Sequence, residues 1–274
     1  MKKLKPAWIG FVGDGDPFTC YEKYAKMGFK AMDSDLSRMS GDRSENLKRF
    51  TDLGLKCLST WLGDFRKLSN EPDEVKKYAE TCNFYGYDNV TIGGSTVISS
   101  FGEPSNNGTY EDMMLDMEAM DKLVKLFEAE GIHLLYHNHF QEFTVEYKGV
   151  AVMDYYLTQI DQRLKLKLDA GWVYVGGVCP VEYMEKAKER IHLLHVKDFT
   201  DIMTPRGFLG RDAESDFGFT SLGTGGLDLK GVLKKAIEIG MEYVIVEQDR
   251  TRHLSWEDSL LCSYLNLKET DMIE

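Results

Sequence analysis

A cluster of titratable and amide side chains follows an apolar run at residues 134–143, LLYHNHFQEF. The run ends in His137, Asn138 and His139, and Glu142 follows shortly after. Imidazoles and carboxylates bind metal ions and transfer protons, and side-chain amides hydrogen bond to hydroxyl groups. The segment therefore carries the residue types that metal-assisted chemistry on a hydroxylated substrate requires.

Three later apolar runs end in the same kinds of side chain. A single acidic residue at a strand end is more commonly a helix N-cap or a surface charge. Four successive runs with such ends favour a shared site, whose oxygen and nitrogen donors suit Mn²⁺, Mg²⁺, Co²⁺ or Zn²⁺. Cysteine takes no evident part, which argues against structural zinc. The three runs are LKLKLDAGW with Asp169, IHLLHVKDF with His195, Lys197 and Asp198, and YVIVEQDR with Glu247, Gln248 and Asp249.

The elements that position these side chains follow a recurring pattern, in which a helix-like segment ends in glycine and an apolar strand begins at once. The pattern occurs at Gly28, Gly54, Gly86, Gly131 and Gly240. Glycine after a helix adopts the left-handed conformation that caps the last turn. Strands alternating with helices predict a parallel sheet. The expected strands are Ala7–Gly13, Phe29–Asp33, Leu55–Trp61, Asn89–Gly93, Ile132–His139, Leu164–Asp169, Ile191–Lys197 and Tyr243–Glu247.

Eight strands, with amphipathic helices such as Tyr110–Glu130 between them, predict a single (β/α)₈ barrel domain over residues 1–274. A doubly wound open sheet fits less well, because the first strand ends in GDGDP rather than G-x-G-x-x-G. In such barrels the C-terminal strand ends line the active site.

The long irregular segment Phe199–Leu227 is expected to be a lid over this end of the barrel. Its LGTGG sequence lies where barrels can bind phosphate, but a tight turn into the next helix is slightly favoured. Asp228 would cap that helix and repel a phosphate group.

Composition limits the partners. The net charge of −12 disfavours binding to nucleic acid, and no apolar run approaches the roughly 20 residues that span a membrane. Five scattered cysteines without C-x-x-C spacing indicate reduced thiols and a cytoplasmic location. The expected partner is a small carbohydrate substrate; whether the chain forms a homo-oligomer is left open.

The ordered motifs YHNHFQEF, LDAGW, HVKDF, LGTGG and VIVEQD resemble the sugar phosphate isomerase/epimerase group of xylose isomerase-like TIM barrels, in its YHNH-x-x-E-F subgroup. The resemblance covers nearly the whole chain. It implies one divalent metal ion, with Mn²⁺ favoured, and it implies Asp169, His195 and Glu247 as ligands.

The ligand from the fifth strand has two candidates. Many members of the resembled group carry glutamate where this chain has His137. A bend after His139 would let Glu142 reach the metal, and this assignment is favoured because a carboxylate adds charge compensation. His139 would then serve as the catalytic base. His137 and His139 share a face of the extended strand, so His137 is the alternative ligand and a second catalytic candidate.

The resemblance implies an isomerase or epimerase that removes a proton next to the carbonyl of a keto sugar or sugar phosphate. Glu247 could act as the second acid/base. Lys197 could donate to the developing oxyanion, or could instead form a buried salt bridge to Asp198 or Glu247. Trp172, Asn138 and Lys197 are the expected substrate contacts. Trp172 replaces a histidine usual in ketose epimerases, which weakens that narrower assignment.

Three other functions stay open. A lyase could use the same proton removal to expel a leaving group, as a dehydratase or a deglycosidase of an oxidised sugar. The chain could be a non-catalytic protein that binds a sugar or a metal, but the several candidate bases argue against this function. An endonuclease IV-like role would need more metal-binding histidines and a basic groove.

Overall fold

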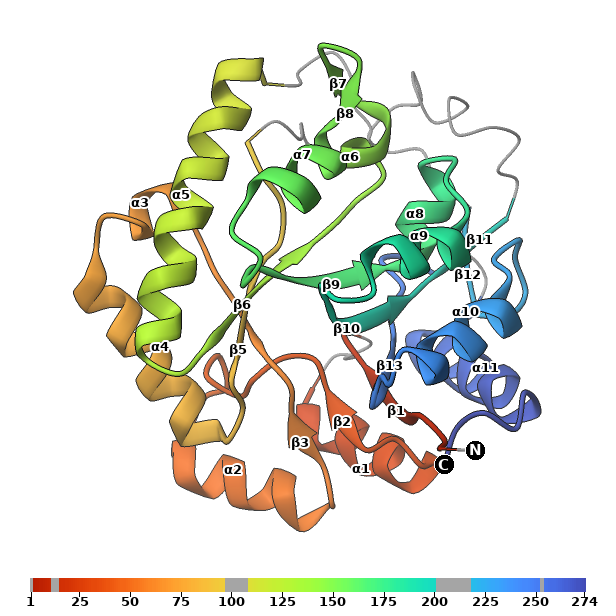
Figure 1. The fold of residues 1–274 in the computed structure, drawn as a ribbon. Helices are drawn as coiled ribbons and strands as arrows, with labels where there is room; N and C mark the ends of the chain where they lie inside the picture. The colour runs from red at the N-terminus through yellow and green to blue at the C-terminus, as the bar shows by residue number, and fades with distance from the viewer. Residues whose placement is uncertain (1, 11–14, 97–107, 201–217, 252–253) are drawn as a thin grey trace.

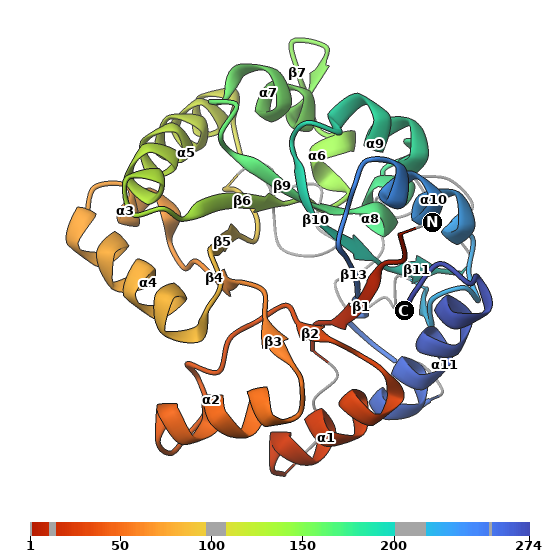
Figure 2. The ribbon, with the colours of Figure 1, turned by 60° about the horizontal axis from the view of Figure 1, so that its bottom comes forward.

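Short parallel strands form a curled nine-stranded sheet in the computed structural model, which describes residues 2–10, 15–96, 108–200, 218–251 and 254–274. Helices surround the ring of strands on its outside (Figure 1, Figure 2). The sheet order is β3-β2-β1-β13-β10-β9-β6-β5-β4. Its two end strands, β3 and β4, are separated in sequence only by Leu58 and Ser59, so the chain itself closes the ring. The predicted (β/α)₈ barrel is confirmed.

Each predicted strand has a counterpart, and the predicted strand Leu55–Trp61 is divided into two. The barrel strands are β1 (Lys5–Trp8), β2 (Ala31–Met32), β3 (Lys56–Cys57), β4 (Thr60–Trp61), β5 (Asn89–Ile92), β6 (His133–His137), β9 (Lys165–Asp169), β10 (Ile191–Val196) and β13 (Tyr243–Val246). Two antiparallel pairs lie outside the ring: β7 (Glu146–Tyr147) with β8 (Val150–Ala151), and β11 (Asp198–Phe199) with β12 (Phe219–Thr220).

Capping residues mark the start of α5 and the end of α4. Thr109 and Asp112 form a reciprocal capping box at the start of the predicted helix, and Gly86 ends α4 at a φ of 76°. None of the described helices is both long and apolar enough to cross a membrane. The helices are α1 (Pro17–Met27), α2 (Arg43–Asp52), α3 (Phe65–Leu68), α4 (Pro72–Tyr85), α5 (Tyr110–Ala129), α6 (Gln141–Thr144), α7 (Val152–Gln159), α8 (Ala170–Val175), α9 (Pro180–Ala187), α10 (Leu229–Glu238) and α11 (Trp256–Glu269).

The two faces of the strands bury different cores. On β6, Leu134 and Tyr136 belong to the large core shared with the helices, whereas Leu135 belongs to a small separate core. Because side chains alternate along a strand, the small core fills the inside of the barrel. Two residues further along, the same inner faces carry polar groups. These are Asp33 on the loop after β2, His137, Lys167 and Asp169, His195 and Lys197, and Glu247.

Candidate metal centre

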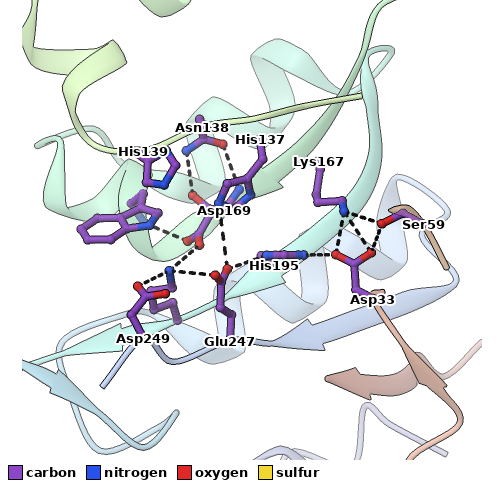
Figure 3. Close-up of polar contacts among 12 residues, drawn as sticks. Asp33, Ser59, His137, Asn138, His139, Lys167, Asp169, His195, Glu247 and Asp249 are labelled. Carbon is purple, nitrogen blue, oxygen red and sulfur yellow. Dashed lines mark hydrogen bonds and ion pairs between the residues drawn. The ribbon is translucent and has the colours of Figure 1, made fainter. Parts of the chain in front are cut away.

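Four side chains at the C-terminal end of the barrel come together as a candidate metal site. Their ligand atoms all lie within 4.8 Å of one another (Figure 3). They come from or directly follow strands that are neighbours in the sheet: β6, β9, β10 and β13. Parallel pairing sets His195 opposite Asp169, which brings these two ligand types to the same level. The four are His137, Asp169, His195 and Glu247.

Glu142, the sequence-favoured ligand of the fifth strand, lies outside this group of four. The chain does bend after His139, but the bend leads into the short helix α6. There the Glu142 carboxylate accepts a hydrogen bond from the phenol of Tyr136 at 2.7 Å and one from the backbone N–H of His139 at 2.9 Å. The structure therefore brings His137, the alternative candidate, to the position expected of Glu142.

The charges around the group of four fit a divalent cation. Asp169, Glu247 and Asp249 surround Lys197, and Asp33 pairs with Lys167. With His195 neutral, as a metal-binding imidazole must be, four carboxylates and two ammonium groups leave two negative charges, which a divalent cation would neutralise. The excess also attracts protons: although burial lowers the pKa of His195, the carboxylates of Glu247 and Asp33 raise it to about 9.

Two buried polar atoms of the grouped residues also fit a cation. Within the described part of the chain, Nδ1 of His137 and Oδ2 of Asp169 accept or donate no hydrogen bond. The nearest cation to that Asp169 oxygen is Lys197, at 3.4 Å. A buried polar atom without a partner costs free energy, and coordination to a metal ion would remove that cost. The donor set of two imidazoles and two carboxylates suits Mn²⁺, Co²⁺ or Zn²⁺.

The imidazoles at the end of β6 are neutral near physiological pH. Burial lowers the pKa of His137 well below its usual value, and burial with the nearby Lys197 lowers the pKa of His139 to about 4. The two rings lie 5.0 Å apart between centroids. A neutral imidazole can bind a metal ion or accept a proton, so both roles that the sequence assigned to this pair are chemically open.

Lys197 lies in a cage of carboxylates. Its Nζ atom is 2.8 Å from Asp249, 3.3 Å from Glu247 and 3.4 Å from Asp169. Burial alone would lower its pKa, but these carboxylates raise it, so Lys197 stays charged. Of the salt bridges that the sequence suggested for Lys197, the one to Glu247 is present.

The other expected substrate contacts are engaged within the protein. The side-chain amide of Asn138 exchanges two hydrogen bonds with the backbone of Asp169, and so joins the ends of β6 and β9. Trp172 is fully buried, within a cluster of Phe140, Val175, Phe199 and Phe219. Both residues thereby shape the wall of the site.

The glycine-rich loop is held by an internal carboxylate. Asp198 accepts hydrogen bonds from the backbone N–H groups of Phe199, Gly223, Gly225 and Leu227. These amides therefore do not form a phosphate cradle, in line with the favoured interpretation as a turn. The predicted lid begins with β11 and continues after β12, whereas its residues 201–217 lie outside the described residues.

Three residues near the site were missed by sequence reasoning: Asp33, Ser59 and Lys167. Asp33 lies 2.5 Å from Nε2 of His195 and 2.7 Å from Lys167. Asp33 also follows an apolar strand, in FKAMDSD, which is the signal used for the other site residues. Lys167 lies two residues before Asp169 in LKLKLD, so the two side chains share a face of the strand. This spacing could have indicated that Lys167 lies near the site.

Residues 21–264, which include all four members of the group, match the family model of the xylose isomerase-like TIM barrel. The chain belongs to this family. An inosose dehydratase of Clostridium beijerinckii is 24% identical over 222 residues, covering 74% of this chain and 73% of that protein. A crystal structure of a sugar phosphate isomerase/epimerase from Parabacteroides distasonis superposes with a TM-score of 0.72 at 20% identity, covering 100% of this chain and 96% of that one.

A second similar structure carries a metal ion. The crystal structure of the IOLI protein with a bound zinc atom has a TM-score of 0.71 and 18% identity, and it covers 97% of this chain and 98% of that one. At these identities the structures establish a shared fold. Isomerases or epimerases and dehydratases both occur among the similar proteins.

Proposed function

We propose that this protein is a divalent-metal-dependent isomerase or epimerase of a keto sugar or sugar phosphate. The observation that carries the proposal is the group of His137, Asp169, His195 and Glu247 at neighbouring strand ends, with the neutral imidazole of His139 beside it. The proposed cation is Mn²⁺, which suits mixed oxygen and nitrogen ligands; the zinc of the IOLI protein makes Zn²⁺ the main alternative.

A cation bound here would supply Lewis-acid stabilisation of the negative charge that develops on a carbonyl oxygen. His139 removes the proton next to that carbonyl, because it is neutral and is not one of the four grouped ligands. Lys197, held charged by its carboxylates, orients Glu247 and Asp169 and adds positive potential at the site. Glu247 is the second proton-transfer group, since its side chain retains 13% exposure.

A lyase is the second candidate, and the inosose dehydratase relative supports it. Removal of the same proton next to a carbonyl can be followed by cleavage of the C–O bond at the adjacent carbon, which releases water or the alcohol of the glycoside. The two reactions differ in their products: an isomerase or epimerase returns a saturated sugar, whereas a lyase forms a carbon–carbon double bond.

One experiment tests the site and separates these reactions. The purified protein is incubated in D₂O with a panel of keto sugars, their phosphates, inososes and 3-oxo-glycosides, with Mn²⁺ or with a chelator. We expect deuterium next to the carbonyl of a saturated product, only when Mn²⁺ is present. An unsaturated product would show that the protein is a lyase rather than an isomerase or epimerase. Asp169→Ala and His195→Ala should each lose the metal, and full metal retention in both would refute the site.

A further inference from the structure

A second buried polar cluster lies beside His195, on the side of its ring opposite to Glu247 (Figure 3). It consists of Asp33 after β2, Ser59 between β3 and β4, and Lys167 on β9, all with 0% exposure. Nζ of Lys167 lies 2.7 Å from one carboxylate oxygen of Asp33 and donates to Ser59 at 2.8 Å. Ser59 donates to the other Asp33 oxygen at 2.5 Å. The carboxylate of Asp33 is therefore fixed by two partners.

The two nitrogens of His195 face different carboxylates. Nδ1 lies 2.6 Å from Glu247, which is one of the four grouped ligands. Nε2 lies 2.5 Å from Asp33, which is outside the group. Neutral imidazole has one N–H donor and one lone pair, and its hydrogen-bond partner decides which nitrogen holds the proton. Once a cation occupies the group of four and engages Glu247, Asp33 is the carboxylate that remains as a hydrogen-bond partner, at Nε2. This favours the tautomer whose lone pair is on Nδ1, toward the group of four.

A purely structural role explains this cluster poorly. A buried Lys–Asp pair must be desolvated, so it adds little net stability compared with apolar side chains of the same size. The inside of the barrel below it is filled by such apolar side chains, among them Leu58 and Leu135. The ammonium of Lys167 also lies 4.2 Å from the ring centroid of Trp61, and that ring stands edge-on to His137. The cluster thus contacts His195 directly and reaches His137 through the ring of Trp61.

We propose that Asp33 is a positioning residue that holds His195 with Nε2 protonated and Nδ1 directed at the cation, and that Lys167 and Ser59 hold Asp33 for this task. The inference rests on the proposed metal site but not on the sugar or the reaction. Metal-binding histidines commonly donate their second N–H to a carboxylate, and loss of such a partner typically weakens metal binding 10- to 100-fold.

Metal affinity of the full chain tests the role without a substrate. Asp33→Asn is compared with Asp116→Asn, a matched control that removes another fully buried carboxylate, paired with Arg66 at 2.6 Å. Mn²⁺ and Zn²⁺ dissociation constants are measured by competition with a chromophoric chelator, and thermal unfolding is followed in parallel. Asp33→Asn should weaken both affinities about 10- to 100-fold, whereas Asp116→Asn should not change them. Unchanged affinity in Asp33→Asn, or equal losses in both variants, would overturn the positioning role.

Two further measurements keep the test decisive. Nitrogen-15 chemical shifts of His195 in the Zn²⁺-loaded parent should show Nε2 protonated and Nδ1 metal-bound; the opposite tautomer would overturn the proposal. If Asp33→Asn does not fold, Ser59→Ala removes one support of the carboxylate and should weaken affinity in the same direction, and unchanged affinity would again overturn it. A parent chain that binds no divalent cation would instead refute the proposed function itself.

Discussion

The carboxylate of Glu142 and the phenol of Tyr136 share a hydrogen bond of 2.7 Å in the interior of the protein. Tyr136 packs against Tyr156 of α7, with ring centroids 5.0 Å apart, on the side of β6 opposite to His137. Glu142 is completely buried there, and burial raises its pKa to about 8. A carboxyl group in this position stabilises the fold best when it is protonated.

The pH dependence of stability should reveal this group. The ordinary pKa of glutamate is 4.5, so between pH 4.5 and pH 8 the unfolded chain releases a proton that the folded chain retains. The contribution of Glu142 to stability is therefore present in full below pH 4.5 and is lost as the pH rises through 8. It amounts to a few kcal/mol at most, since each pKa unit corresponds to about 1.4 kcal/mol. The free energy of unfolding, measured by urea denaturation, should fall between pH 4.5 and pH 8 in the parent relative to Glu142→Gln. Parallel plots of this free energy against pH for the two proteins would contradict the prediction.

The same residue separates the two candidate ligands of the fifth strand. His137→Asn should weaken Mn²⁺ binding by about tenfold or more, because it removes a member of the group of four. Glu142→Gln should bind Mn²⁺ as the parent does, because its side chain points away from that group and can still accept from the N–H of His139. Chelator competition measures both. Weak Mn²⁺ binding in Glu142→Gln together with unchanged binding in His137→Asn would make Glu142 the ligand.

Sequence alone indicated much of the barrel and three members of the group of four, for physical reasons. Strand periodicity and glycine caps such as Gly86 are local signals, and they marked the elements. Parallel strand ends converge in a barrel, so Asp169, His195 and Glu247 could be grouped without knowing any distance.

Two features of the site, the orientation of Glu142 and the cluster around Asp33, could not be predicted because they depend on geometry outside the individual strands. The orientation of Glu142 follows from the helical conformation of Phe140, the residue that precedes α6, three positions after the end of β6. The pairing of Asp33 with Lys167 spans 134 positions and exists only once the ring is closed. Residues just past a strand end, and contacts across the barrel, are therefore where local patterns stop being informative.

Replacing Lys197 should make the fold depend on metal. Lys197→Met leaves Asp169, Glu247 and Asp249 near one another without their shared ammonium group, and breaking such a buried network costs about 3–5 kcal/mol. The melting temperature with chelator should fall strongly, and Mn²⁺ should restore part of the loss by supplying positive charge. Lys235→Met, which breaks ion pairs to Glu185 and Glu238 at the surface, is the control. Equal Mn²⁺ shifts in Lys197→Met and the parent would contradict the prediction.

The carboxylate of Asp198 should be a major support of the glycine-rich loop. Asp198→Ala leaves four backbone N–H groups without their acceptor, in a loop that packs against β11. The hydrogen bonds from Phe199 and Leu227 are buried. At about 1 kcal/mol or more for each buried donor left unsatisfied, the free energy of unfolding should fall by roughly 2 kcal/mol or more. Asp228→Ala removes a single helix-capping bond to Gly231 and should cost about 1 kcal/mol. Urea denaturation compares them, and equal costs would refute the special role of Asp198.

His139 should be needed for proton transfer but not for metal binding. His139→Asn keeps the backbone N–H that donates to Glu142, and it leaves the group of four intact. Asparagine cannot accept a proton at neutral pH, so turnover should fall by about 10²- to 10⁴-fold while Mn²⁺ affinity stays at the parent value. His192→Asn is the control, because His192 lies at the opposite end of β10 beside His133, and it should keep full activity. Deuterium exchange next to the carbonyl, with the sugar found active in the panel, measures the step directly. Exchange at the parent rate in His139→Asn would place the base elsewhere, with Glu247 the next residue to replace.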